Sequence, residues 1–73
     1  MSEEYLREFF ALCRAGLNIN LGKFCDKHNI YRSDFTNFMK GNKYYTSLIE
    51  LDIMKEDILF NCSKFTELYK KIG

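Results

Sequence analysis

Apolar residues recur every three or four positions through most of this chain, which is the period of helices that bury one face. Near the N-terminus the row consists of Leu6, Phe9, Phe10, Cys13 and Leu17. Ser2 precedes the row as a candidate N-cap, and Glu3 and Glu4 follow it, where the positive end of a helix favours acidic side chains. Gly16 is placed to end the helix. The pattern therefore predicts a first helix between Ser2 and Gly16.

Two shorter apolar rows follow and predict two short helices joined by a tight turn, over about residues 21–40. The first helix covers about residues 21–28 with Asn20 as its N-cap, and the second covers about residues 31–40 and ends at Gly41. Asn29 stands where the backbone must become left-handed, a conformation that Asn tolerates best after Gly. The residues predicted to point inward are Leu21, Phe24, Cys25, His28, Ile30, Phe35, Phe38 and Met39.

The C-terminal part of the chain, residues 47–72, continues the helical spacing. Ser47 is a candidate N-cap, and the apolar row contains Leu48, Leu51, Met54, Ile58, Cys62, Phe65, Tyr69 and Ile72. One long helix or two helices broken near residues 61–63 both fit this row. We favour two, because one long helix would leave much of its apolar row uncovered. The chain is thus predicted to be all-α, a compact single domain of four to five helices over residues 1–73.

Length and composition narrow the possible classes of protein. Seventy-three residues form one small domain, and the absence of Pro with only four Gly favours helices. The three Cys lie inside apolar patterns, as expected of buried thiols in a reducing compartment. The acidic start lacks the apolar core of a secretion signal, and no apolar run is long enough to cross a membrane. We therefore expect a cytoplasmic protein without a membrane partner.

The net charge is only +1, but the charge is unevenly distributed along the chain. Residues 20–45 contain five Lys or Arg and two Asp, a net charge of +3, whereas the segments on either side are each at −1. A local excess of positive charge on the two short helices is the pattern that binding to phosphates requires.

The same two short helices resemble the helix-turn-helix of lambda-repressor-like proteins from phages and bacteria. In that family the first motif helix has two adjacent inward residues, the second of them small, and here these are Phe24 and Cys25. A turn residue, usually Gly, follows four positions later and precedes an aliphatic residue; here they are Asn29 and Ile30. The resemblance covers about residues 21–53, less than half of the chain.

The second motif helix matches the family in spacing and differs in residue type. Its two inward residues, three positions apart, are Phe35 and Phe38, and a basic Gly-containing stretch follows at residues 40–43. The family has aliphatic residues at these inward positions, Ala where Cys25 stands and Gly where Asn29 stands. The aromatic pair implies a bulkier core, and the other two differences are physically mild.

The resemblance implies a small transcriptional regulator that binds double-stranded DNA as a homodimer, with residues 31–40 as recognition helix in the major groove. Helical spacing places the same outward residues on the side away from Phe35 and Phe38. Arg32 can hydrogen-bond guanine, and Asn37 can hydrogen-bond adenine. Asp34 is unfavourable near phosphate and is expected to serve its helix N-terminus. The predicted DNA-binding residues are Tyr31, Arg32, Ser33, Thr36, Asn37, Lys40, Lys43 and Lys23.

The alternative interpretation is a protein-interaction module of the phage or mobile-element type, which inhibits a host protein or nuclease and uses these helices as scaffold. Tyr44 and Tyr45 are candidates for contact with such a partner, although partial burial over the core explains them equally well. An apolar excess near the C-terminus predicts a dimer interface formed by Phe65, Leu68, Tyr69 and Ile72.

The sequence predicts no catalytic, metal or cofactor site. Cys25 and His28 have a spacing found in zinc sites, but no second pair of ligands completes the set, so we expect a core Cys and a half-buried His. No cysteine has a neighbouring base, no acid–base pair stands out, and no glycine-rich phosphate loop is present. We therefore expect a protein that is not an enzyme.

Overall fold

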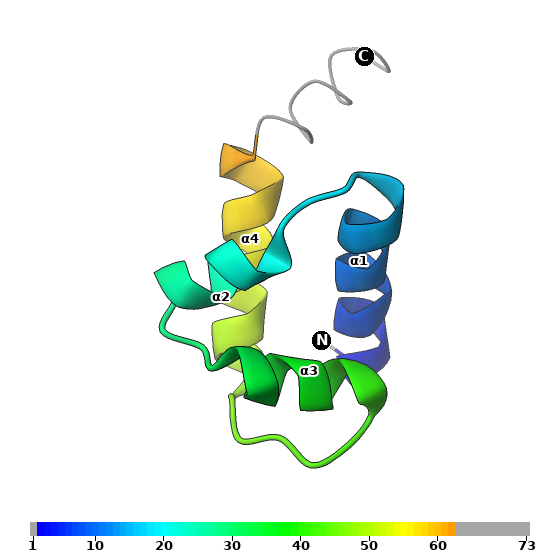
Figure 1. Ribbon diagram of the computed structural model, residues 1–73, viewed down its shortest axis with the longest axis vertical. Coiled ribbons are helices and arrows are strands. Elements are labelled where there is room, and N and C mark those ends of the chain that lie inside the picture. The colour runs from blue at the N-terminus through cyan, green and yellow to red at the C-terminus, as the bar shows by residue number, and fades with distance from the viewer. Residues whose placement is uncertain (1, 63–73) are drawn as a thin grey trace.

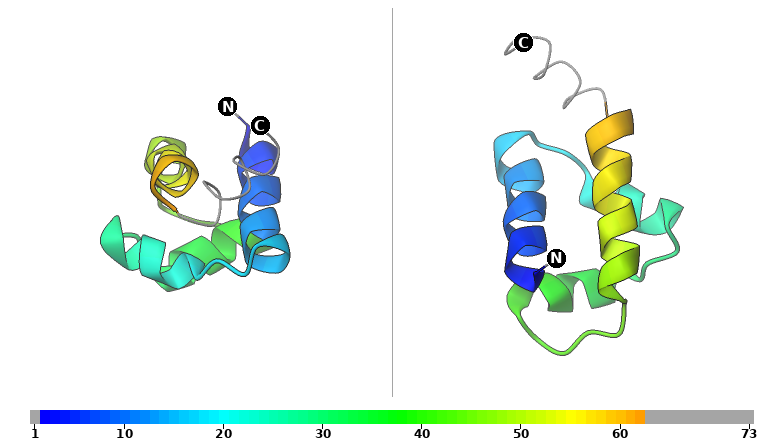
Figure 2. Two further views of the ribbon diagram at one scale, coloured as in Figure 1. Left: turned by 90° about the horizontal axis from the view of Figure 1, so that it is seen from above. Right: turned by 180° about the vertical axis from the view of Figure 1, so that it is seen from behind.

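The computed structural model describes residues 2–62, and within this part of the chain it contains four α-helices and no strand. The helices are α1 (Glu3–Gly16), α2 (Leu21–Lys27), α3 (Arg32–Lys40) and α4 (Leu48–Asn61). α1 and α4 lie side by side and run in the same direction, and α3 crosses the end of the pair where both begin (Figure 1). α2 contacts each of the other three helices, and the view from behind shows the α1–α4 pair without α2 in front of it (Figure 2). The all-α prediction is confirmed.

Three of the four helices begin at the residues that the sequence predicts as caps. Ser2 Oγ accepts a hydrogen bond from the Tyr5 amide at 3.1 Å, and Asn20 Oδ1 accepts one from the Lys23 amide at 3.4 Å. Ser47 Oγ accepts one from the amide three residues later at 3.2 Å. Each bond satisfies an amide that has no carbonyl partner in the first turn of its helix.

The ends of α1 and α2 differ slightly from the prediction. α1 ends at Gly16 as expected, but the left-handed residue that turns the chain is Asn18, with φ 53°. The Ile19 amide then donates to the Cys13 carbonyl at 3.0 Å, which closes the end of the helix. α2 ends at Lys27, one residue earlier than predicted, and His28 is its C-cap.

The turn between α2 and α3 has the predicted conformation. Asn29 adopts φ 58°, and the next amide, of Ile30, donates to the Cys25 carbonyl at 2.8 Å. The Ile30 side chain is buried. Gly41 ends α3 with φ 78°, a conformation that costs a residue without a Cβ very little. Asn29 and Gly41 together fix where α3 begins and ends.

The core lies where the four helices meet, and its centre is aromatic. The Phe10 ring contacts the rings of Phe35 and Phe38 edge to face, with centroids 5.1 and 6.5 Å apart. Cys13 and Cys25 are fully buried beside them, as predicted. Burial raises the pKa of both thiols, that of Cys13 to about 11, so neither is a thiolate at neutral pH.

α4 confirms the predicted inner row and adds a second apolar row. Leu51, Met54 and Ile58 are buried in the core, with Leu48 and Cys62 packed at its edge. The second row, Ile49, Ile53 and Phe60, faces solvent. The sequence pattern led us to the inner row and not to this second one.

The predicted break in the C-terminal row is found at the end of α4. The helix ends at Asn61, and Cys62 is extended with φ −87° and ψ 120°. Any second helix, and the predicted interface residues Phe65, Leu68, Tyr69 and Ile72, lie outside the described residues. None of the helices formed by residues 2–62 combines the length and the apolar content that a bilayer crossing requires.

Candidate nucleic-acid interface

The side of α3 that points away from the core is polar along its whole length. Phe35 and Phe38 point inward, and at ~100° per residue the side opposite them is formed by four residues. Three of these are exposed and Asn37 is half-buried. We call this surface the outer face of α3; its members are Ser33, Thr36, Asn37 and Lys40. All four belong to the set predicted from the sequence.

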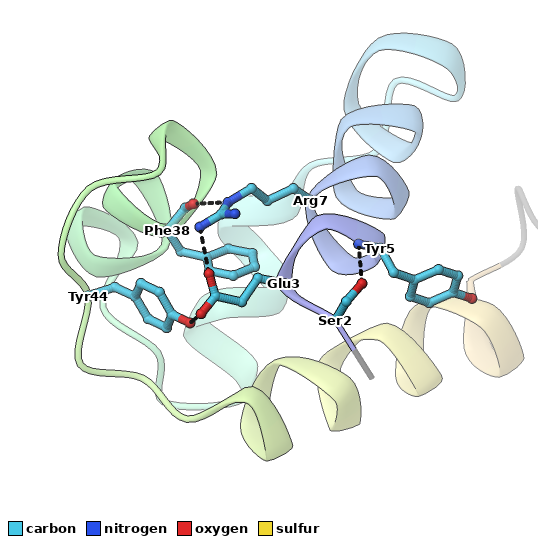
Figure 3. Close-up of polar contacts among 6 residues, drawn as sticks. All are labelled: Ser2, Glu3, Tyr5, Arg7, Phe38 and Tyr44. Carbon is cyan, nitrogen blue, oxygen red and sulfur yellow. Dashed lines mark hydrogen bonds and ion pairs between the residues drawn. The ribbon is translucent and has the colours of Figure 1, made fainter.

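Contacts with α1 hold the C-terminal end of α3 in place. Arg7 Nε donates to the Phe38 carbonyl at 2.6 Å, and the guanidinium lies 4.8 Å from the centre of the Phe38 ring (Figure 3). The Glu3 carboxylate accepts hydrogen bonds from Arg7 at 3.2 Å and from the Tyr44 hydroxyl at 2.7 Å. The bond to Glu3 raises the pKa of Tyr44. Tyr44 also packs against the Phe38 ring, with centroids 5.0 Å apart. Of the two interpretations of Tyr44, partial burial over the core describes its place in the fold.

Asp34 anchors the loop between α3 and α4. Its carboxylate accepts hydrogen bonds from the amides of Tyr45 and Thr46, at 2.8 and 2.7 Å, and from the Thr46 hydroxyl. Burial alone would raise the pKa of Asp34, but the bonds from Thr46 and Tyr45 outweigh it, and the pKa lies below its usual value. The sequence assigned Asp34 to the N-terminus of its own helix. Nothing in the local spacing indicates a bond that spans eleven or twelve residues.

Arg32 lies at the edge of α3 that faces α2. Its Nε and Nη2 atoms donate to the two carboxylate oxygens of Asp26 at 3.1 and 2.5 Å. Gly22 permits this position, because a Cβ at residue 22 would lie 2.9 Å from the Arg32 Cζ atom. Arg32 is exposed, as its predicted outward position requires, and its guanidinium is bound to a carboxylate of α2.

Some lysines of the described residues form salt bridges with carboxylates, and others do not. Lys27 pairs with Asp57, and Lys55 pairs with carboxylates of its own helix. Lys23 and Lys40, by contrast, are exposed and have no salt-bridge partner within residues 2–62. Lys43 is also exposed, with its ammonium 5.5 Å from the centre of the Tyr45 ring. The cations available to an anionic ligand therefore include one at the N-terminus of α2 and two at the C-terminal end of α3.

Two exposed tyrosines line a groove between α3 and the loop that precedes α4. Tyr31 and Tyr45 have exposed fractions of 81% and 82%. The groove has a volume of about 540 Å³ and is also lined by Ser33 and Asn37. Its wall includes the carboxylates of Asp34 and Glu50, which repel phosphate, so the groove itself suits the edge of a base better than the backbone of a nucleic acid.

His28 belongs to a different part of the molecule, the contact between α2 and α4. The Asp57 carboxylate lies 2.7 Å from His28 Nε2. It forms an ion pair with Lys27 Nζ at 2.8 Å and accepts a hydrogen bond from Asn61 Nδ2 at 2.8 Å. The bond from Lys27 contributes most to lowering the pKa of Asp57 to about 2. His28 is half-buried as predicted. Residues 2–62 contain no group of three His, Cys, Asp or Glu arranged to hold a metal ion.

Comparisons of the chain with protein-family models, with curated proteins and with solved structures found no match.

Proposed function

We propose that this chain is a small transcriptional regulator that binds double-stranded DNA, with α3 in the major groove. The observation that carries the proposal is the outer face of α3, a polar helix surface near unneutralised lysines. A helix in the major groove needs short polar side chains toward the base edges and cations toward the phosphates on both sides. The resemblance of α2, the turn and α3 to the lambda-repressor-like pattern supports the same function.

Each residue of the outer face suits one kind of contact. Asn37 can form two hydrogen bonds with adenine, and Ser33 can bond a base or a phosphate. The Thr36 hydroxyl donates to the Arg32 carbonyl at 2.9 Å, so this residue offers its methyl group and an acceptor. We assign phosphate contacts to Lys40 and Lys43 at the C-terminal end of α3, and a further one to Lys23 at the N-terminus of α2.

Arg32 takes part in the proposed complex only after its bond to Asp26 is broken. The pair is exposed, and such pairs exchange readily with solvent and with phosphate. We assign sequence preference first to Asn37 and Ser33, and we give Arg32 and Tyr31 supporting contacts at the N-terminal end of α3.

A selection experiment from random duplex DNA tests the proposal. The native chain should enrich a defined sequence at moderate salt. In salt titrations of that complex, Lys40→Ala should reduce the slope of log K against log salt by about one unit, and affinity for unrelated DNA should fall equally. Glu8→Ala, at an exposed position on α1, is the control and should leave both unchanged. No enrichment, or equal salt slopes for the native chain and Lys40→Ala, would contradict the proposal.

A second candidate function is binding to a protein partner, as in an inhibitor of a host protein or nuclease. Two observations favour it: Tyr45 is highly exposed beside Lys43, and α4 presents an apolar row to solvent. A cellular activity that survives Asn37→Ala and Lys40→Ala but is lost in Tyr45→Ala would support this candidate over DNA binding.

A further inference from the structure

The solvent-facing side of α4 carries three large apolar residues in one row. Ile49, Ile53 and Phe60 have exposed fractions of 73%, 52% and 75%. At ~100° per residue they lie opposite the buried residues Leu51, Met54 and Ile58. A helix at the surface of a small domain normally has polar residues on this side. We call the row the outer face of α4; packing within residues 2–62 does not account for it.

The surroundings of this outer face are acidic. Residues 48–61 contain four Asp or Glu and one Lys, a net charge of −3. The single Lys55 is buried between Asp52 and Glu56, at 3.0 and 3.3 Å, and so presents little positive charge outward. Glu50 and Glu56 are exposed. Two such faces packed on each other would bring like charges together, so the partner surface should be apolar and basic.

The sequence of this chain contains a segment with that chemistry. Residues 63–73 include three Lys and one Glu, a net charge of +2. Their apolar residues recur at intervals of three or four positions, as Phe65, Leu68, Tyr69 and Ile72. These eleven residues follow α4 directly and lie outside the described part of the chain.

We propose that residues 63–73 of a second copy cover the outer face of α4, and that the exchange is reciprocal and forms a symmetric dimer. The row from Ile49 to Phe60 extends over ~16 Å of helix, and residues 63–73 start at its Phe60 end. A copy that covered its own row would have to reverse direction immediately after α4. Among the residue types common in such reversals, residues 62–72 contain Ser63 alone. A second copy requires no reversal.

The dimer is measured without nucleic acid, so this inference stands or falls separately from the proposed DNA binding. Light scattering and sedimentation velocity should show the native full-length chain as a dimer that weakens with added salt. Ile53→Glu and Phe60→Glu should each produce monomers with unchanged helical circular dichroism. Tyr31→Glu is the matched control, because Tyr31 is as exposed as Phe60 but lies at the start of α3, and it should remain a dimer.

A double variant tests which segment covers the row. Lys70→Glu combined with Lys71→Glu removes the positive charge that the acidic surroundings attract, and it should be monomeric at low salt. A native monomer would overturn the proposal, and so would a double variant that stays dimeric, since the two α4 helices would then pack directly on each other. Loss of helical circular dichroism in both Ile53→Glu and Phe60→Glu would assign the row to the core and overturn it too.

Discussion

The outer faces of α3 and α4 both point away from the core, and they differ in every other respect. The outer face of α3 has short polar side chains and lies near lysines without salt-bridge partners. The outer face of α4 has three large apolar side chains among acidic ones. The face of α3 suits a polar anionic ligand such as DNA, and the face of α4 suits an apolar and basic protein segment. We therefore propose separate partners for two helices that share one core.

The largest expected difference comes from truncating one phenylalanine in each helix, the buried Phe38 of α3 and the exposed Phe60 of α4. Phe38→Ala removes a fully buried ring that contacts Phe10, Tyr44 and Arg7, and it should cost about 3–5 kcal/mol of the free energy of unfolding. Phe60→Ala removes an exposed ring and should change the folded monomer by less than about 0.5 kcal/mol. Urea titrations in dilute solution measure both. A large loss in Phe60→Ala would show that the outer face of α4 belongs to the core.

Asp57 has a structural role that the other acidic residues of α4 do not share, because it joins α4 to Lys27 and His28 at the end of α2. The fold lowers the pKa of Asp57 from 3.8 to about 2. The ionised Asp57 therefore stabilises the folded state fully at pH values above the pKa of the unfolded chain, and this stabilisation is lost as the pH falls through about 2. Asp57→Asn should therefore cost up to about 2 kcal/mol at neutral pH. The cost should shrink between about pH 4 and pH 2 in thermal melts. Glu8→Gln, at an exposed position on α1, is the control, and an equal loss in both variants would contradict the assignment.

DNA affinity should distinguish the two faces directly. Asn37→Ala should weaken binding to the selected sequence by about 1–3 kcal/mol and relax its sequence preference, because it removes a contact to a base edge. Ile53→Ala removes a side chain of similar size from the outer face of α4. It should weaken dimer formation and leave the affinity for a DNA half-site unchanged. Titrations with a DNA half-site measure this without the dimer. Equal losses in the two variants would show that the faces do not have separate partners.

The smallest effect is expected at the edge between α3 and α2. Asp26→Asn releases the Arg32 guanidinium and removes a negative charge near the proposed DNA, so binding should strengthen by roughly several-fold. Folding should be little affected, because the pair is exposed on both sides. Lys23→Gln makes the opposite change in charge on the same helix and should weaken binding. Unchanged affinity in Asp26→Asn would exclude Arg32 from the complex.

Local signals in the sequence were sufficient for most of the fold. The caps Ser2, Asn20 and Ser47, the left-handed Asn29 and the terminating Gly41 act through neighbouring backbone groups, so their residue types predict the helix boundaries closely. The inner row of α4 was equally clear, since a period of three to four residues is itself the signature of a buried helix face.

The parts of the candidate site that depend on distant residues could not be predicted in this way. Asp34 binds amides of the following loop, and Arg32 is held by a carboxylate of the preceding helix over a glycine. Neither contact has a characteristic spacing. The outer face of α4 was missed for a different reason: its apolar residues were visible, but the inner row already explained the helix.

Mapping the amide signals of the labelled chain by NMR, while a selected DNA duplex is added, tests the central claim most directly. We expect shifts in the amides of Ser33 to Lys40, which carry the outer face of α3, in the amide of Lys43 just after it, and in the amide of Lys23 at the N-terminus of α2. The amides of Ile49, Ile53 and Phe60 should keep their positions as DNA is added. Shifts confined to α4, or a map in which α3 does not respond to DNA at all, would contradict the claim that α3 binds DNA.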